Sequence, residues 1–84
     1  MEEKQIGTVT HYFTNINVGI IQLSDTLKVG DTLHFKGHTS DFTQLIDSMQ
    51  IEHTKVQEAK AGDAVGIKVK DHVRQHDTVY KVTG

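Results

Sequence analysis

Histidine is the residue type in this chain that most invites a chemical role, because imidazole binds metal ions and transfers protons near neutral pH. The 84-residue sequence contains six histidines, which are His11, His34, His38, His53, His72 and His76. Two pairs are spaced four residues apart. That spacing brings two side chains to one metal ion on a helix, but separates them by about 13 Å along a strand. Because both pairs fall in segments predicted as strand or loop, we predict no metal site and no bound cofactor.

Serine hydroxyls provide the other candidate chemistry, because a serine activated by a histidine is a nucleophile. The chain has three serines, Ser24, Ser40 and Ser48, and none stands in a Gly-x-Ser-x-Gly turn. Ser40 is expected in a loop and Ser48 in a strand. Cysteine is absent, which excludes thiolate nucleophiles, thiolate metal ligands and disulfides. We therefore predict no catalytic residue and expect that the chain is not an enzyme.

A nucleotide site is not expected either. The sequence has no Gly-x-x-x-x-Gly-Lys-Ser/Thr loop, in which backbone N–H groups and a lysine bind phosphates. The segment from Asp63 to Gly66 fits a loose Asp-x-x-Gly pattern. We interpret this match as coincidence, because these residues open a predicted strand. The chain should bind no nucleotide of its own.

Five side chains are the candidates for contact with RNA or a protein partner: His34, Lys36, Lys68, Lys70 and Arg74. His34 and Lys36 share the outward face of one predicted strand, and Lys68 and Lys70 share that of another. If these strands adjoin, the surface could contact a few phosphates of an RNA such as transfer RNA. The formal net charge of −2 lacks the basic excess of a typical nucleic-acid binder. A solvated charged face is the alternative.

Length and composition indicate a single small domain over residues 1–84. A chain of this length needs most of its apolar side chains for one core. No apolar run approaches the ~20 residues that cross a bilayer, and the first residues lack the layout of a signal peptide. Small extracellular domains usually need cysteines, so a cytoplasmic location and no membrane partner are expected. The oligomeric state is left open.

Alternating apolar and polar residues predict six strands and no convincing helix. The predicted strands cover residues 4–13, 16–23, 32–36, 42–53, 65–70 and 78–82. The first two are expected to form a hairpin. Two alternatives exist for 42–53, because Asp47 falls on the inward side there: a β-bulge shifts the register, or the segment is partly helical. We favour the strand.

Two Gly-Asp turns introduce predicted strands in the same way. Gly30-Asp31 precedes the strand at 32–36, and Gly62-Asp63 precedes the strand at 65–70. The glycine supplies a positive φ, and the aspartate bonds the nearby backbone. Short strands separated by turns predict an all-β fold, a small closed six-stranded antiparallel Greek-key β-barrel. Side chains fill a barrel of this size, so binding is expected on its outer surface.

Four pieces of sequence, in this order and at these separations, resemble the second domain of translational GTPases such as elongation factor Tu. They are Ile6–Val9, Leu27–Leu33, Asp47–Ile51 and Ala59–Ile67. The resemblance implies a β-barrel of the translation-factor domain 2 type, used as a docking surface. The chain then acts as a non-catalytic adaptor that binds RNA or a protein in translation or RNA modification.

An alternative follows from the same resemblance, because the barrel is also similar to the accessory domain at the C-terminus of some collagenase-like peptidases. In that case the chain is an accessory subunit or a detached C-terminal-type domain of such a peptidase or of another modifying enzyme. The first hairpin, residues 11–17, departs from the glycine-rich turn of the translation factors. We therefore transfer no RNA-contacting residue from that family.

Overall fold

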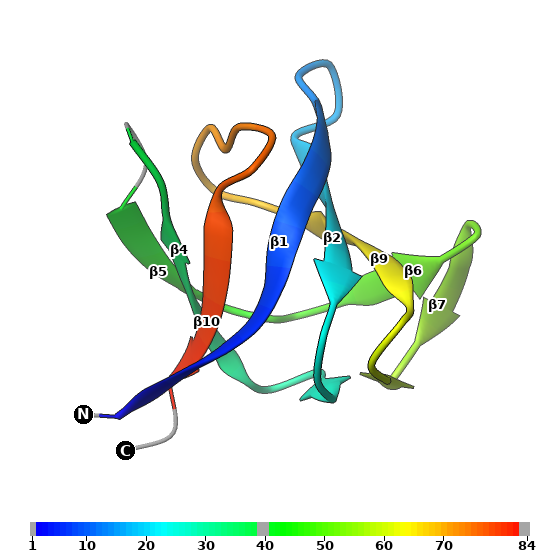
Figure 1. Cartoon of the computed structure of the whole chain (residues 1–84). Coiled ribbons are helices and arrows are strands. Elements are labelled where there is room, and N and C mark those ends of the chain that lie inside the picture. Colours follow the sequence, from blue (N-terminus) through cyan, green and yellow to red (C-terminus); the bar gives the residue numbers. More distant parts are fainter. Residues whose placement is uncertain (1, 39–40, 83–84) are drawn as a thin grey trace.

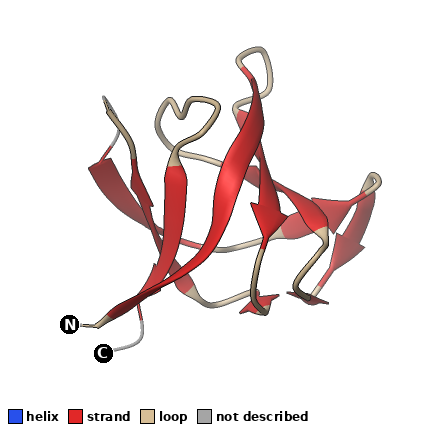
Figure 2. Cartoon of the chain, viewed as in Figure 1, coloured by secondary structure: helices blue, strands red, loops and turns tan. Residues whose placement is uncertain are grey.

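The computed structural model describes residues 2–38 and 41–82, which form ten β-strands joined by short turns (Figures 1 and 2). The strands are β1 (Glu3–Phe13), β2 (Val18–Leu23), β3 (Leu27–Lys28), β4 (Thr32–Lys36), β5 (Asp41–Leu45), β6 (Met49–Ile51), β7 (Thr54–Val56), β8 (Glu58–Ala59), β9 (Ala64–Lys68) and β10 (Thr78–Val82). No helix in these ranges is long and apolar enough to cross a membrane.

Eight of the strands form one curled antiparallel sheet in the order β5-β4-β10-β1-β2-β9-β6-β7. The remaining two, β3 and β8, pair with each other in a small second sheet. The long strand β1 lies at the centre of the large sheet, between β10 and β2 (Figure 1). The all-β prediction is confirmed, as are the β1–β2 hairpin and the strands predicted at 32–36 and 78–82.

The concave side of the curled sheet is filled by apolar side chains, because alternate residues of each strand point inward. The buried apolar residues are Ile6, Val9, Ile21, Leu23, Leu27, Leu33, Phe35, Ile46, Met49, Ala59, Val65, Ile67, Val69, Val73 and Val79. Phe35 stacks on Phe42 of the neighbouring strand, with ring centroids 5.0 Å apart. Any binding surface must therefore lie on the outside of the sheet.

Three turns share one construction, and each leads into a strand of the large sheet. We call them the aspartate turns: Lys28–Asp31 before β4, Lys60–Asp63 before β9, and Arg74–Asp77 before β10. In each, the aspartate carboxylate accepts the N–H of the first residue at 2.9 Å. The aspartate N–H donates to the carbonyl of the same first residue, at 3.1, 3.0 and 3.1 Å. The aspartate thus fixes the turn from both sides.

The third residue of every aspartate turn has a positive φ, as a type II turn requires. It is Gly30 with φ 100° in the first turn, Gly62 with φ 94° in the second, and His76 with φ 78° in the third. The two Gly-Asp turns were predicted from the sequence. The third was not, because histidine stands where the other two have glycine.

Each aspartate turn is also joined to a buried residue elsewhere by two backbone hydrogen bonds. The third residue of the turn donates to that residue's carbonyl, and that residue donates to the aspartate carbonyl, at 2.7 to 2.9 Å. The buried partners are Ile46 for the first turn, Leu23 for the second and Val9 for the third. The turns therefore attach the start of one strand to the backbone of another segment.

The prediction of a closed six-stranded barrel is wrong. The large sheet has eight strands, and its two end strands, β5 and β7, do not pair with each other (Figure 1). One side chain bridges part of this opening: Gln44 on β5 donates from Nε2 to the Lys68 carbonyl at 2.6 Å, and its Oε1 accepts the Lys70 N–H at 2.9 Å. A side-chain amide thus takes the place of a strand-to-strand ladder.

The single long strand predicted at 42–53 is also wrong. It is divided into β5 and β6, because Ile46 leaves the ladder to pair with the first aspartate turn. Ile46 is buried, whereas Asp47 is exposed in the gap between the strands. The break removes the inward-facing Asp47 that the sequence pattern implied. The polar segment 54–60 adds the short strands β7 and β8, which no periodicity indicated.

We expect Asp77 to be the most important of the three turn aspartates, because its side chain is 5% exposed and lies against Gly37, with no room for a Cβ there. Asp77→Ala should lower the free energy of unfolding by about 2 kcal/mol, since a charge-assisted hydrogen bond is lost in a buried place. Asp31→Ala and Asp63→Ala should each cost about 1 kcal/mol, by analogy with the loss of a helix cap. Urea denaturation measures all three.

Asp77→Asn is the matched control, because it keeps an oxygen that can accept the Arg74 N–H. It should cost less than Asp77→Ala. Equal losses for Asp77→Ala and Asp31→Ala would contradict the ranking by burial.

Candidate functional site

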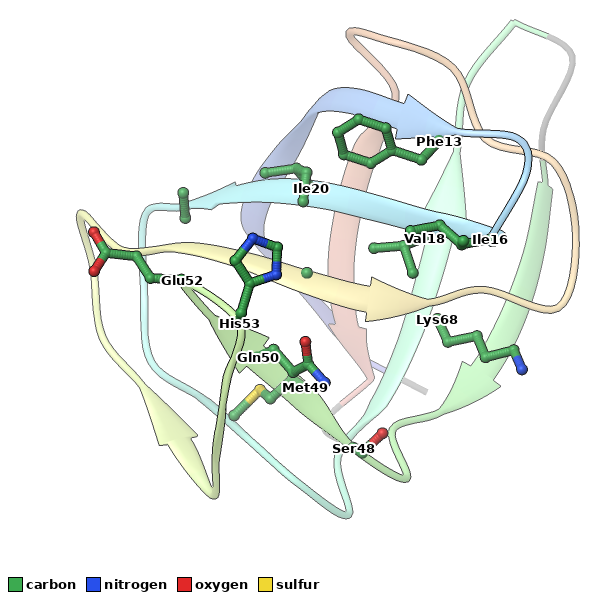
Figure 3. Close-up of a pocket in the computed structure, with 12 residues that line it drawn as sticks. Phe13, Ile16, Val18, Ile20, Ser48, Met49, Gln50, Glu52, His53 and Lys68 are labelled. Atoms are coloured by element: carbon green, nitrogen blue, oxygen red, sulfur yellow. The ribbon is translucent and has the colours of Figure 1, made fainter.

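The main hollow on the outside of the sheet is an apolar groove over strands β2, β9 and β6 (Figure 3). Its volume is about 450 Å³, within the range of small-ligand and peptide sites. The residues that line it are Phe13, Ile16, Val18, Ile20, Ser48, Met49, Gln50, Glu52, His53, Ala64, Gly66 and Lys68. Apolar side chains dominate this set, and the charged ones stand at its ends.

The floor of the groove is low because Gly66 in the middle of β9 has no side chain. Gly66 pairs with Ile20 of β2 on one side and with Gln50 of β6 on the other. A Cβ at this position would lie 3.4 Å from both Ile20 Cδ1 and Val18 Cγ1, which is ordinary van der Waals contact. The backbone would therefore tolerate a side chain here, and its absence is what opens the groove.

One wall of the groove exposes large apolar side chains at the tip of the β1–β2 hairpin. Phe13 is 44% exposed and Ile16 is 58% exposed. Among the described residues only one other large apolar side chain is as exposed, Leu45 at 55%, and it lies on β5, outside the groove. Two exposed apolar residues that border one groove indicate an interaction site more strongly than a scattered pair would.

The opposite wall is the tip of the β6–β7 hairpin, where the backbone is strained. Met49 pairs with Val56 and Ile51 with Thr54, which leaves Glu52 and His53 as a two-residue turn. Both have positive φ, 50° and 66°. Such turns favour Asn-Gly, and a larger side chain in the left-handed region costs about 1 kcal/mol. In Figure 3 the His53 ring lies over the groove.

His34, predicted as a partner-facing residue, is already held by two carboxylates. Its Nδ1 lies 2.7 Å from Glu3 Oε2 on β1, and its Nε2 is hydrogen-bonded to the Asp41 carboxylate on β5. Its side chain is 16% exposed, and its ring lies 6.1 Å from that of Tyr80. The hydrogen bond to Asp41 raises the pKa of His34 above 6.5; burial opposes this shift, and Glu3 adds to it.

The two strands that carry the predicted cations are not neighbours in the sheet. The sheet order places β10, β1 and β2 between β4, which carries Lys36, and β9, which carries Lys68. Lys68 lines the groove, and the Lys70 backbone is bound by Gln44 nearby. Arg74 is the first residue of the third aspartate turn. The condition on which the phosphate-binding surface depended, that the two strands adjoin, is therefore not met.

Other sequence candidates are placed as follows. Within residues 2–38 and 41–82 no three His, Asp or Glu side chains lie close enough to hold a metal ion. The ring centroids of Tyr12 and His72 lie 4.5 Å apart, and those of His11 and Phe13 lie 4.4 Å apart. Ser48 lines the groove, whereas Ser40 lies outside the described residues.

The groove itself was not predicted from the sequence. Its signals are a glycine in the middle of an alternating strand and two apolar residues, Phe13 and Ile16, beside a polar turn. Gly66 lies two residues before Lys68 and so shares the face predicted to point outward, which is where the structure places the groove. Nothing in one sequence shows that three separate segments meet around it.

The chain resembles peptidase proteins. It is 39% identical over 77 residues to the "Uncharacterized protease MJ0090" of Methanocaldococcus jannaschii, a match that covers 90% of this chain and 19% of the protease. The chain therefore spans about a fifth of that relative's length. No protein-family model matches the sequence.

Solved structures show the same fold. The C-terminal domain of a putative U32 peptidase from Geobacillus thermoleovorans superposes with a TM-score of 0.88 at 23% identity, over 95% of this chain and 93% of that one. Its selenomethionine variant gives 0.86 at 23% identity, over 90% and 96%. At this identity the likeness shows the fold alone.

The expected kinship with the second domain of translational GTPases is therefore wrong, because the sequence matches a protein described as an uncharacterized protease and the fold matches the C-terminal domain of a putative U32 peptidase. The misleading feature was the Gly-Asp pattern at Gly30 and Gly62. It arises from the aspartate turns, which start strands in this fold.

His34 gives the fold a pH dependence. Since its pKa is raised in the folded state, the stability it contributes is complete below pH 6.5 and is lost as the pH rises through the folded-state pKa. We expect the free energy of unfolding of the wild type to fall between pH 6 and pH 9 by more than that of His34→Gln. Urea denaturation at the two pH values measures the difference.

The other five histidines are common to both proteins, so the comparison isolates His34. The same pH dependence in wild type and His34→Gln would contradict the assignment.

Relief of the strained hairpin should stabilise the fold. Replacing Glu52-His53 by Asn-Gly should raise the free energy of unfolding by about 1 kcal/mol, because these residues accept positive φ at lower cost. Thermal or urea denaturation measures the gain. Lys55→Asn, on β7 two residues after the turn, is the control and should give no gain. An unchanged stability for the double variant would show that the turn is not strained.

Proposed function

We propose that this chain is a non-catalytic accessory domain that serves a peptidase-type catalytic unit, on the same polypeptide or on a separate one. The observation that carries the proposal is the 39% identity to a segment that makes up 19% of a protease. The fold of the C-terminal domain of a putative U32 peptidase supports it. The catalytic groups would then lie in the part of such a protein that has no counterpart here.

The arrangement of the described side chains supports a non-catalytic role. His34, the histidine with a raised pKa, is bound by carboxylates on both ring nitrogens, so neither nitrogen is available as a base for a substrate. In the groove, Ser48 and His53 are both present, but no hydrogen bond joins them. Binding without chemistry is what such a surface can offer.

The groove supports a binding role for the domain. It combines the exposed side chains of Phe13 and Ile16 with a hollow above Gly66, which the side chain of a larger residue at that position would fill. An apolar groove bounded by charged residues is suited to hold a flexible polypeptide by its side chains. We infer that the domain contributes binding affinity to an enzyme whose chemistry takes place elsewhere.

A domain exchange tests the proposal. We expect the M. jannaschii protease without its 77 matched residues to hydrolyse labelled casein at least tenfold more slowly than the intact protease. A chimera that carries this chain in their place should recover to within about threefold, and this chain alone should hydrolyse nothing. The tenfold loss corresponds to about 1.4 kcal/mol of lost transition-state stabilisation.

The matched control is a chimera with Leu45→Ser, which changes an exposed apolar residue outside the groove. It should recover as the unmodified chimera does. Full activity of the deletion variant, or hydrolysis by this chain alone, would overturn the accessory role.

A further inference from the structure

Two opposite charges stand at the two ends of the apolar groove. Lys68 is the last residue of β9, and Glu52 follows β6 at the other end, beyond the pairing of Gln50 with Gly66. Gln50 pairs with Gly66, so the same antiparallel register continued by two residues brings Glu52 near the level of Ala64. Ala64 is four strand positions from Lys68. At 3.3 Å per residue the two levels are about 13 Å apart. Figure 3 shows the two side chains on opposite sides of the groove.

Neither charge is neutralised by a residue in the ranges 2–38 and 41–82. In the part of the chain that the structure describes, Glu52 and Lys68 form no ion pair, whereas Lys4 pairs with Asp25 and Lys28 with Glu58. Both side chains are therefore available to a ligand. The surface between them is apolar, formed by Val18 and Ile20 among others.

The position of Glu52 is maintained at an energetic cost. It occupies a left-handed backbone conformation that asparagine or glycine would adopt more easily. Strain of this kind is concentrated at functional sites, where the side chain rather than the turn is needed. The strained turn is thus a second observation that points to the same end of the groove.

We propose that the groove binds a short free peptide of about four residues with bulky apolar side chains. An extended tetrapeptide spans about 13 Å between its terminal groups, which matches the separation of the two levels. Its ammonium group lies at Glu52 and its carboxylate at Lys68, while its side chains contact the apolar floor. This ligand rests on the proposed peptidase role, because such enzymes consume or release peptides.

The charge pattern distinguishes this ligand from other occupants of an apolar groove. A fatty acid would use Lys68 alone, and a segment inside a longer polypeptide would present no charged ends. A free peptide uses both charges, and only in one orientation. The chemistry of the two ends therefore provides the test.

The experiment titrates this chain with the tetrapeptide Ala-Leu-Phe-Leu and follows amide chemical shifts in the NMR spectrum. Shifts should be confined to the groove. Acetylating the amino end or amidating the carboxyl end should each weaken binding about threefold to fivefold, the effect expected of one exposed ion pair.

Two charge variants assign each end. Lys68→Gln should weaken binding of the free peptide by the same factor and leave the amidated peptide unaffected. Glu52→Gln should also weaken binding of the free peptide by this factor, and it should leave binding of the acetylated peptide unaffected. The pairing of each variant with one modified peptide is a double-mutant cycle, which isolates the two contacts.

Gly66→Val should abolish binding of all forms, because its methyl groups occupy the floor between Ile20 and Val18. Urea denaturation establishes that this variant folds, and Gly66→Ala, with only ordinary contacts, gives a partial loss. Leu45→Ser, outside the groove, should bind as the wild type does.

Equal affinity for free and doubly blocked peptides would overturn the proposal in favour of a polypeptide segment. Equal affinity for the free and the acetylated peptide, with weaker binding of the amidated peptide, would favour a fatty acid. The absence of shifts at millimolar peptide would exclude a peptide site. Because the titration uses this chain alone, each of these results leaves the domain-exchange result unaffected, and the two proposals fail separately.

Discussion

The fold depends on an aspartate carboxylate that accepts the backbone N–H three residues before it. This interaction occurs three times, in front of β4, β9 and β10, and each time the turn it stabilises is joined by two backbone bonds to a buried residue. A domain of 84 residues has a small core, so local bonds that set the direction of strands carry much of the specificity. The second turn joins the start of β9 to Leu23 of β2, and these two strands carry much of the groove.

The sequence predicted those strands whose pattern is local. β4 and β10 alternate clearly and were located to the residue, and two of the three aspartate turns carry a glycine that marks them. The third turn has His76 at the positive φ, a type of residue that gives no such signal. β3 and β8, with two residues each, are too short for any periodicity, and the break at Ile46 is caused by a tertiary contact.

The binding surface was predicted less well, because it depends on strand order. Outward-facing residues follow from alternation, and Lys68 was correctly expected on an outer face. The sheet order alone decides which outward faces adjoin. It separates the strand of Lys68 from the strand of Lys36, and Lys68 lies instead in one groove with Phe13 and Ile16. His34 was expected to be available to a partner, yet Asp41 on the adjacent β5 and Glu3 on β1, beyond β10, both bind its ring, a contact that no spacing in the sequence shows.

Gln44 has a mechanical consequence. In a fully closed barrel, opening the wall requires the rupture of a whole row of backbone bonds. Here the two bonds of one amide side chain join β5 to the segment after β9, and the continuous ladder runs the other way, through β4, β10, β1 and β2. The sheet is therefore a split ring, joined at this point by two side-chain hydrogen bonds and by the short 46–48 connection between β5 and β6. We expect its wall to open at this point more readily than at the continuous ladder between β2 and β9, which carries the floor of the groove.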